Sequence, residues 1–561
     1  MSVAPVAVSR VHVFADRAWE QYLELNPLWA TSQGDERWDD RLDDPGPQGR
    51  AAQLAMVEGW ASDLQAFDGT DLPTEDAVTL DLMRVVVTRV RQAHDLRLWE
   101  MEAIDQYGGP QGLIGELARL QRADSAEHLA RLLARLAAYP SWMEAHRANV
   151  EAGLASGRTA AAPVVERCIT QTRRMLEAPA EQSPIVLANA SLGDATRDAL
   201  VDAVARHVRP AHAAWLAMLE RYAGRVRAGD GICHLPDGDA LYRHHILAWT
   251  TLAEEPRSIH EYGLERLADV EAQERRIAAE LHHGGIGELR RFLDSSPDNH
   301  AGQPDQLIGM AEELVARAEA QASRWFGRLP SDGCAVRPVE PHMEQEAPPA
   351  FYVPPNEDGS RRGAYFINTY DPASRPLHRL AATTFHEAVP GHHFQIAIEQ
   401  ELPDLPTFRR FGSRLAGGAY VEGWALYAER LAGEMGLYRD PRERFGALES
   451  EAWRAARLVV DTGIHALGWT RQQSIDLLRE RAGLSRLEAE TETDRYISWP
   501  GQALSYMIGQ REILALRAEL EWRDGDRFDP RAFHDATIGH GSLPLSTLRA
   551  QLPGWVTPRG G

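Results

Sequence analysis

The sequence predicts a mostly α-helical protein with two lobes and one small β-sheet. From about Arg10 to Phe326, apolar residues recur at helical spacing with little interruption. Between residues 330 and 355, seven prolines exclude long helices, and two short runs of β-favouring residues lie in and just after this region. Helical patterns return beyond these runs. We therefore expect a helical lobe over residues 1–328 and a second lobe over residues 329–561, joined in one continuous body.

The composition is that of a folded, acidic protein. Of the 561 residues, 44% are hydrophobic and 25% are charged, which is ordinary for a globular chain with a substantial core. The net charge is −22, and all 60 basic residues are arginine. Such a surface repels phosphate backbones and anionic lipids. We expect neither nucleic acid nor a membrane as a partner; the sequence leaves the oligomeric state open.

The cysteines and the N-terminus favour a cytoplasmic location. Cys168, Cys233 and Cys334 are far apart in sequence and form no C-x-x-C pair, so neither a disulfide framework nor a cysteine-rich metal site is indicated. The stretch from Met1 to Val13 has no basic segment followed by an apolar one, as a signal peptide would. No stretch reaches the length of a membrane span.

The sequence of the first lobe predicts a series of successive helices. The run Asp124-Ser125-Ala126-Glu127, an N-cap with an acid three residues on, is typical of a helix start, and the leucines that follow at helical spacing extend to Pro140, where we expect the helix to stop. Another helix begins near Leu264 and ends before Gly284. We interpret these apolar stripes as core. The His-His and Cys-His pairs of this lobe lack a matching set of acids and histidines and are interpreted as structural.

The small sheet is expected from residues 350–353 and 363–369. Aromatic and β-branched residues in these runs, with a glycine-containing turn region between them, are typical of short strands. The second run precedes His386 by some fifteen residues, so an exposed strand there could pair with an extended substrate backbone. In that case Asn368 would bind an amide of the substrate.

A candidate zinc site follows the sheet. His386 and Glu387 begin a pattern like H-E-x-x-H, in which two histidines four residues apart hold one ion from the same helix face. Here Pro390 replaces the second histidine, and His392 comes six residues after His386, about 240° around a regular helix. We expect Pro390 and Gly391 to overwind or bulge the helix so that His392 reaches the ion.

His393 is the alternative second ligand. It returns to the face of His386, but it lies about 10 Å further along a regular helix, which is far for a shared ion. We therefore prefer His392 as the ligand. We expect His393 to lie near the site and to contact a ligand residue or the substrate without binding the ion. The choice between the two stays open at this point.

Two acids of a later helix complete the predicted site. A catalytic zinc takes three protein ligands and keeps one position open, and a glutamate from a second helix is a common third ligand. Glu422, thirty residues after His392, fits this role. Glu429 lies two turns further on nearly the same face, from which it could orient a ligand histidine. The site would hold one Zn²⁺ per chain.

Most of the chain resembles a known family, the domain of unknown function 885 (DUF885). The resemblance rests on Asn26–Thr31, Trp38-Asp39, Tyr107–Gln111, Ile259–Leu264, the stretch around His386, Arg457–His465 and Trp499–Tyr506. It implies a relationship to the gluzincin zinc metallopeptidases, and with it a large helical metallopeptidase-like body with a small sheet beside the zinc-motif helix. The family does not imply a particular substrate.

Two further stretches supply polar groups. Arg457, Asp461 and His465 follow each other at intervals of four, which places them along one helix face that could line a cleft, with Arg457 as a substrate-binding group and Asp461 in a supporting role. Hydrolysis of a peptide creates an oxyanion, which a phenol or imidazole beside the metal stabilises. Tyr506 is our first choice and His465 the second. Helical gluzincins carry a tyrosine in this role, which favours Tyr506 by resemblance.

The sequence thus predicts a zinc hydrolase that cleaves short peptides, with Glu387 as the general base. Two other interpretations stay open. In one, the same site cleaves a non-peptide amide. In the other, the site binds no metal and the chain is a helical binding or scaffold protein.

Overall fold

The computed structural model describes residues 9–69, 71–340, 344, 348–356 and 361–558, and most of them are helical, as predicted. The helices before the sheet are α1 (Arg10–Leu25), α2 (Pro27–Gln33), α3 (Pro47–Gln65), α4 (Thr74–Asp95), α5 (Leu113–Leu120), α6 (Ala126–Ser156), α7 (Ala162–Glu177), α8 (Pro184–Ala188), α9 (Asp194–Ala203), α10 (Arg209–Tyr222), α11 (Gly238–Thr250), α12 (Pro256–Glu280), α13 (Ile286–Ser295) and α14 (Pro304–Trp325). Those after it are α15 (Leu377–Glu387), α16 (His392–Gln400), α17 (Thr407–Phe411), α18 (Ala419–Glu434), α19 (Pro441–His465), α20 (Arg471–Arg481), α21 (Arg486–Ser498), α22 (Ser505–Asp524), α23 (Pro530–Ile538) and α24 (Leu545–Trp555).

Helix α6 begins where the sequence predicts and ends later. Its first turn is capped by Ser125, whose hydroxyl accepts a hydrogen bond from the backbone N–H of His128 at 3.0 Å. The helix continues through Pro140 to Ser156, so the predicted stop at Pro140 is wrong. Leu132, Leu136, Tyr139 and Met143 are buried on both sides of the proline, and their packing keeps the helix continuous at the cost of one backbone hydrogen bond.

The sheet contains three short strands, β1 (Ala335–Pro338), β2 (Ala350–Val353) and β3 (Ala364–Ile367), in the order β1-β3-β2. Strands β2 and β3 are the two predicted ones and pair antiparallel, whereas β1 pairs with β3 in parallel. The sequence analysis missed β1 because four residues ending in a proline carry little strand signal. Since β3 is paired on both edges, it cannot accept a substrate strand, and the expectation that it does is corrected.

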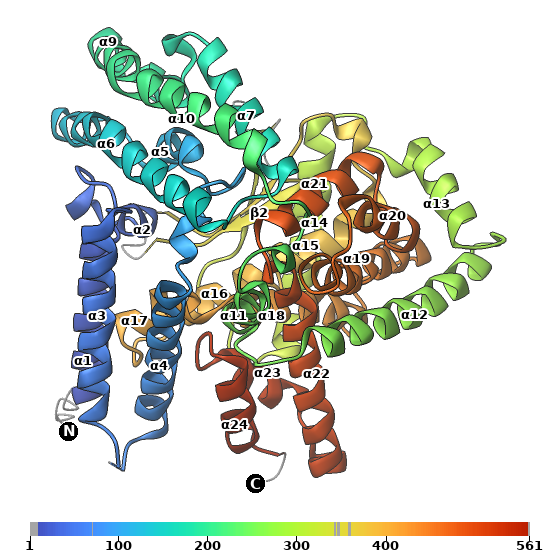
Figure 1. The fold of residues 1–561 in the computed structure, drawn as a ribbon. Helices are drawn as coiled ribbons and strands as arrows, with labels where there is room; N and C mark the ends of the chain where they lie inside the picture. Colours follow the sequence, from blue (N-terminus) through green and yellow to red (C-terminus); the bar gives the residue numbers. More distant parts are fainter. Residues whose placement is uncertain (1–8, 70, 341–343, 345–347, 357–360, 559–561) are drawn as a thin grey trace.

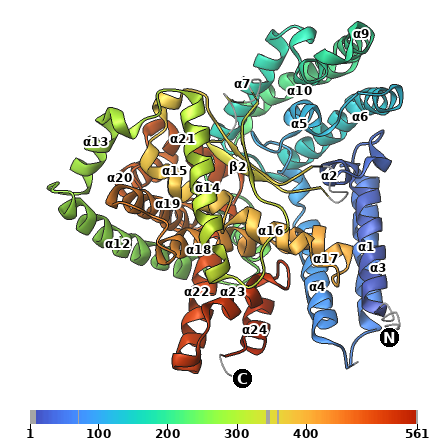
Figure 2. The same cartoon turned by 180° about the vertical axis from the view of Figure 1, so that it is seen from behind.

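The sheet lies beside the helices that carry the zinc motif. Helix α14 packs on β1 and α15, and β2 packs on α15. Tyr365 and Ile367 of β3 are buried in the main hydrophobic core. Figures 1 and 2 show the sheet close to α14, α15 and α16, with α12, α13 and α20 on one side of the molecule and α1, α3 and α4 on the other. The small sheet therefore packs against α15, the helix that carries His386.

Helices from both predicted lobes share their cores. Helix α12 packs along α19, and one core joins buried residues from Val78 to Val556. Another core joins α1, α3 and α4 to Phe408 and Phe411 of α17. The predicted boundary between residues 328 and 329 is therefore not a gap between separately packed units. In the described ranges of the chain, no helix is both long and apolar enough to cross a lipid bilayer.

Candidate metal centre

His386 and His392 lie on either side of a break between two helices. Helix α15 ends at Glu387, the backbone leaves helical geometry at Ala388 (φ −104°, ψ −106°), and α16 begins at His392. The expected overwound or bulged helix is thus replaced by a complete interruption. The break has the predicted effect on the side chains, because the two imidazole rings lie 4.8 Å apart, centroid to centroid.

Two contacts explain why this sequence makes the break. A Cβ atom on Gly391 would lie 1.9 Å from the carbonyl oxygen of His386, so only glycine allows the chain to pass this close. The carbonyl of Pro390 accepts a hydrogen bond of 2.9 Å from the indole N–H of Trp424, on α18. Trp424 is fully buried and thereby fixes the loop between the two histidines to the helix that carries Glu422.

Glu422 joins the two histidines from α18. Its Oε2 lies 3.7 Å from Nε2 of His386 and 3.5 Å from Nε2 of His392. The three side chains offer ligand atoms within 4.8 Å of one another, in the only such group of three or more found among the described residues. Burial raises the pKa of Glu422, but the two imidazoles hold it well below its usual range. The carboxylate is therefore ionised, as a metal ligand must be.

The donor set fits a zinc ion. Bonds of about 2.0–2.2 Å in a tetrahedral arrangement place two ligand atoms roughly 3.3–3.5 Å apart, close to the separations of Glu422 from the two imidazoles. Oε2 of Glu422 is buried and has no hydrogen-bond partner in the described part of the chain, an arrangement that costs free energy unless a cation is present. Two histidines and one glutamate also leave one tetrahedral position open.

Glu429 orients His386, as the sequence predicts. Its Oε1 lies 2.8 Å from Nδ1 of His386. Because a carboxylate only accepts, Nδ1 carries the hydrogen, and Nε2 is the atom that faces Glu422. Without an ion, burial lowers the pKa of His386, but the carboxylate of Glu422 at 3.7 Å and the hydrogen bond with Glu429 raise it to about 9. A bound metal would take the place of the Nε2 proton.

His393 lies outside the group. Its Nδ1 is 3.1 Å from the hydroxyl of Tyr352, on β2, and its Nε2 is 3.1 Å from the carbonyl oxygen of Asp332. Burial lowers the pKa of His393 to about 4, so the ring is neutral. The structure thus brings His392, not His393, beside His386 and Glu422. His393 connects the start of α16 to the sheet.

Glu387 and Tyr506 are the half-buried polar groups beside this centre. Glu387, the last residue of α15, makes no hydrogen bond or ion pair with the described residues. The ring of Tyr506 stacks on that of His386 with centroids 6.3 Å apart. Tyr506 comes this close because α22 and α18 pack through Gly509 and Gly423, where a Cβ on Gly509 would lie 1.9 Å from the carbonyl oxygen of Ala419.

Arg457 supports Tyr506 instead of facing a substrate. It is 3% exposed, and its guanidinium lies 4.3 Å from the centroid of the Tyr506 ring. Its Nε donates to the hydroxyl of Tyr496 at 3.0 Å, and its Nη2 to Glu492 at 3.2 Å. The predicted role in substrate binding is corrected to one of positioning. Sequence analysis missed Tyr496 and Glu492, since nothing in their local sequence distinguishes them from core and surface residues.

Asp461 and His465 lie on the predicted helix face, but other elements cover them. His465 is 1% exposed, and its ring nitrogens contact the carbonyl oxygen of Tyr496 at 2.9 Å and the backbone N–H of Ile232 at 3.3 Å. Both nitrogens are therefore used, which excludes His465 as an oxyanion-stabilising group. Asp461 accepts hydrogen bonds from the hydroxyl of Tyr242 at 2.6 Å and from the N–H of Gly501 at 3.0 Å. It holds the turn that leads into α22.

Asn368 is also corrected. It is 1% exposed, donates to the carbonyl oxygen of Glu344 at 2.6 Å and accepts from the N–H of Tyr370 at 3.0 Å. It therefore fixes the end of β3 to neighbouring loops and does not face a substrate. Periodicity assigned these residues to faces of their elements but could not show which other elements cover those faces.

The chain is similar to two solved structures. It matches the crystal structure of a predicted lipoprotein from Colwellia psychrerythraea with a TM-score of 0.89 and 25% identity, over 98% of this chain and 100% of that one. It matches a predicted lipoprotein of unknown function from Shewanella oneidensis with a TM-score of 0.76 and 21% identity, over 97% and 99% of the two chains. At 21% identity the second likeness shows the fold alone.

A comparison with curated proteins finds no match. The family model described as bacterial protein of unknown function, DUF885, matches residues 27–552, which include every residue of the candidate metal centre. The chain therefore belongs to the DUF885 family.

Proposed function

We propose that the chain is a zinc-dependent hydrolase that cleaves short peptides, in the manner of a gluzincin metallopeptidase. The observation that supports this most is the convergence of Nε2 of His386, Nε2 of His392 and the unpartnered Oε2 of Glu422. These residues would hold one Zn²⁺ per chain. When bound, the ion polarises a substrate carbonyl and lowers the pKa of a coordinated water towards 7.

Glu387 is the proposed general base. It follows His386 directly, is half-buried and has no partner among the described residues that would occupy its carboxylate. It can accept a proton from the attacking water and return it to the leaving amine. Tyr506, stacked on His386, would donate a hydrogen bond to the oxygen on which negative charge develops. Arg457 keeps the Tyr506 ring in place.

The substrate is proposed to be a small peptide, with a non-peptide amide as the alternative for the same site. A panel of dipeptides, tripeptides and acylated amines separates these two. Hydrolysis should require zinc and should be lost in Glu387→Gln, which keeps the ligands and removes the base. About one equivalent of zinc with cleavage of peptides supports the proposal. Less than about one-tenth equivalent in protein purified without chelator would instead support a metal-free binding or scaffold protein.

The proposed surroundings are the cytoplasm, without nucleic acid or membrane as a partner. This rests on the net charge of −22 and the three unpaired cysteines. The two solved structures described above are of predicted lipoproteins. The appropriate test is to compare soluble and membrane fractions of the native bacterium with an antibody against the chain. Recovery in the membrane fraction would contradict the proposed location.

A further inference from the structure

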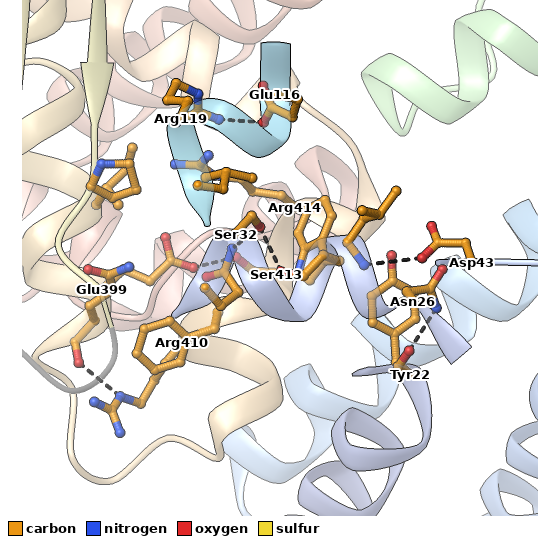
Figure 3. A pocket seen from close by; sticks show the side chains of 18 of the residues that line it. Tyr22, Asn26, Ser32, Asp43, Glu116, Arg119, Glu399, Arg410, Ser413 and Arg414 are labelled. Atoms are coloured by element: carbon orange, nitrogen blue, oxygen red, sulfur yellow. Dashed lines mark hydrogen bonds and ion pairs between the residues drawn. The ribbon is translucent and has the colours of Figure 1, made fainter. Parts of the chain in front are cut away.

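A cavity of about 480 Å³ lies beside α16, the helix that begins at His392 (Figure 3). Residues of α1, α2 and α5 line one side, and residues of α16, α17 and the following 3₁₀ helix η11 (Ser413–Ala416) line the other. His386, His392 and Glu422 are not among the lining residues. The cavity is therefore a separate space, built where the N-terminal helices meet the segment between the two histidines and Glu422.

One face of α16 joins the metal centre to this cavity. His392 is the first residue of the helix, and Ile396, Glu399 and Gln400 line the cavity. These positions are i, i+4, i+7 and i+8, which form a single helical face. At 1.5 Å per residue, these three cavity-lining residues lie about 6–12 Å along the helix axis from His392. An extended peptide advances about 3.3–3.6 Å per residue, so the cavity lies about two to four residues from a bond cleaved at the metal centre.

Two arginines of the cavity wall have no ionic partner. In the ranges that the structure describes, no carboxylate forms an ion pair with Arg410 or Arg414, although the chain carries a net charge of −22. Nε of Arg410 donates to the carbonyl oxygen of Gln400 at 2.8 Å, which leaves its terminal nitrogens available. Arg119, on the same cavity, is different, because it pairs with Glu116 at 2.5 Å (Figure 3).

Apart from Glu116, which pairs with Arg119, the acids of the cavity accept hydrogen bonds from neutral groups. Glu399 is buried, and its carboxylate accepts hydrogen bonds from Ser413, from Gln395 and from the hydroxyl and backbone N–H of Ser542. Asp43 accepts from the N–H of Leu28 at 3.1 Å. Neither acid forms an ion pair with Arg410 or Arg414, so both guanidinium groups remain available to an anionic ligand.

Aromatic rings form part of the cavity wall. Trp29 lines the cavity together with Tyr22, and the two rings meet edge to face at 6.1 Å. The indole nitrogen of Trp29 is buried and exposes almost no surface to the cavity. The guanidinium groups of Arg410 and Arg414 are therefore the donors that a ligand can reach, and they favour an anionic oxygen ligand.

We propose that this cavity binds a carboxylate of the peptide substrate, with Arg410 and Arg414 as its donors. The carboxylate is either the C-terminus or an acidic side chain, two to four residues from the cleaved bond. The identification of the ligand as a peptide rests on the proposed function. The substrate class is then short peptides with an anionic group near one end, and the distance between the cavity and the metal centre limits their length.

The test measures binding and hydrolysis separately. Three probes are titrated calorimetrically into zinc-loaded Glu387→Gln protein: N-acetylated tetra-alanine with a free C-terminus, its C-terminal amide, and an amide of the same length that ends in aspartate. The free acid should bind about tenfold or more tightly than the tetra-alanine amide. If the aspartyl amide binds like the free acid, a side-chain carboxylate suffices; if it binds like the tetra-alanine amide, the C-terminus is the group recognised.

Variants in the same background assign the donors. Arg410→Gln and Arg414→Gln should each remove most of the preference for the acid, whereas Arg119→Gln should keep it because Arg119 is already paired. Arg414 is exposed, so its replacement leaves the fold intact even if that of Arg410 does not. Equal affinity for acid and amide, or a preference that survives both replacements, would overturn the inference.

Hydrolysis of acid and amide by the unmodified protein distinguishes the carboxylate site from the proposed peptidase activity. Cleavage of both peptides without preference would contradict only the proposed carboxylate site. Preferential binding of the acid without cleavage would contradict only the proposed peptidase activity.

Discussion

Oε1 of Glu429 lies 2.8 Å from Nδ1 of His386, forty-three residues earlier in the chain. Glu422, two turns earlier on α18 than Glu429, approaches the other nitrogen of the same ring. One imidazole is thus held between two carboxylates of a single helix. Glu429 sets the tautomer and the orientation of the ring, and Glu422 shares the position where an ion would bind.

Replacement of Glu429 by glutamine tests this arrangement. The amide oxygen can still accept from Nδ1, but the negative charge that makes His386 a stronger ligand is lost. We expect the zinc affinity to fall by about 10–100-fold in a competition assay with a zinc indicator. Glu434→Gln is the matched control, because Glu434 lies at the exposed end of the same helix and, among the described residues, forms its ion pair with Arg517. An affinity for Glu429→Gln equal to that of the control would contradict the assigned role.

Tyr506→Phe tests the oxyanion-stabilising group. The ring remains stacked on His386 and under Arg457, and only the hydroxyl is lost. We expect kcat for peptide hydrolysis to fall by about 10²–10³-fold with unchanged zinc content, since a single donor to an oxyanion contributes this much. Tyr370→Phe, at an exposed tyrosine, is the control. Unchanged kcat in Tyr506→Phe would exclude the hydroxyl from catalysis.

Two replacements of Asp461 test its structural role. Both of its partners, Tyr242 and Gly501, donate to Oδ1, which asparagine retains. Asp461→Asn should therefore unfold with nearly the same free energy as the unmodified chain. Asp461→Ala leaves two buried donors unsatisfied, at about 1–3 kcal/mol each. Denaturant unfolding and zinc content measure both effects, and loss of zinc in the asparagine variant would show that Asp461 acts at the metal instead.

The metal should bind more tightly as pH rises. In the metal-free protein, burial opposes the charge of His386, but Glu422 and Glu429 raise its pKa from 6.5 to about 9. Protonation of His386 therefore contributes to the free energy of unfolding. This contribution is fully present below pH 6.5 and is lost as the pH rises through 9. Zinc must displace the proton, so its affinity should increase about tenfold per pH unit in this range.

Thermal unfolding of chelator-treated and zinc-loaded protein checks this pH dependence. At a fixed free zinc concentration, the increase in Tm on adding zinc should be larger at pH 9 than at pH 6.5. An increase that is the same at both values would mean that His386 is not the group that zinc deprotonates.

The sequence predicted the helical fold and that the candidate ligands lie on helices, because apolar periodicity and the spacing of histidines and acids are local signals. Helix geometry also predicted that Glu429 could orient a ligand histidine, but only the structure identifies that histidine as His386. The break between α15 and α16 was predicted only as an irregularity, since its form depends on Trp424, thirty-four residues beyond Pro390.

What the sequence could not show is burial by distant elements. His465 lies on the predicted face of α19, but Tyr496 and Ile232 use its ring nitrogens, and neither is a neighbour in sequence. Asn368 belongs to a strand that is paired on both edges, which depends on β1, a strand that the sequence pattern does not reveal. Arg410 and Arg414 of the cavity wall likewise differ from the paired Arg119 only in lacking an ion pair with a described residue, which the sequence does not show.

The zinc content of His392→Ala and His393→Ala, measured side by side, tests the central claim most directly. In the structure His392 faces His386 and Glu422, whereas both ring nitrogens of His393 contact Tyr352 and Asp332. After dialysis against a weak chelator, His392→Ala should retain almost no zinc and His393→Ala should retain most of one equivalent. A zinc-replete His392→Ala protein beside a zinc-free His393→Ala protein would contradict the proposed metal centre.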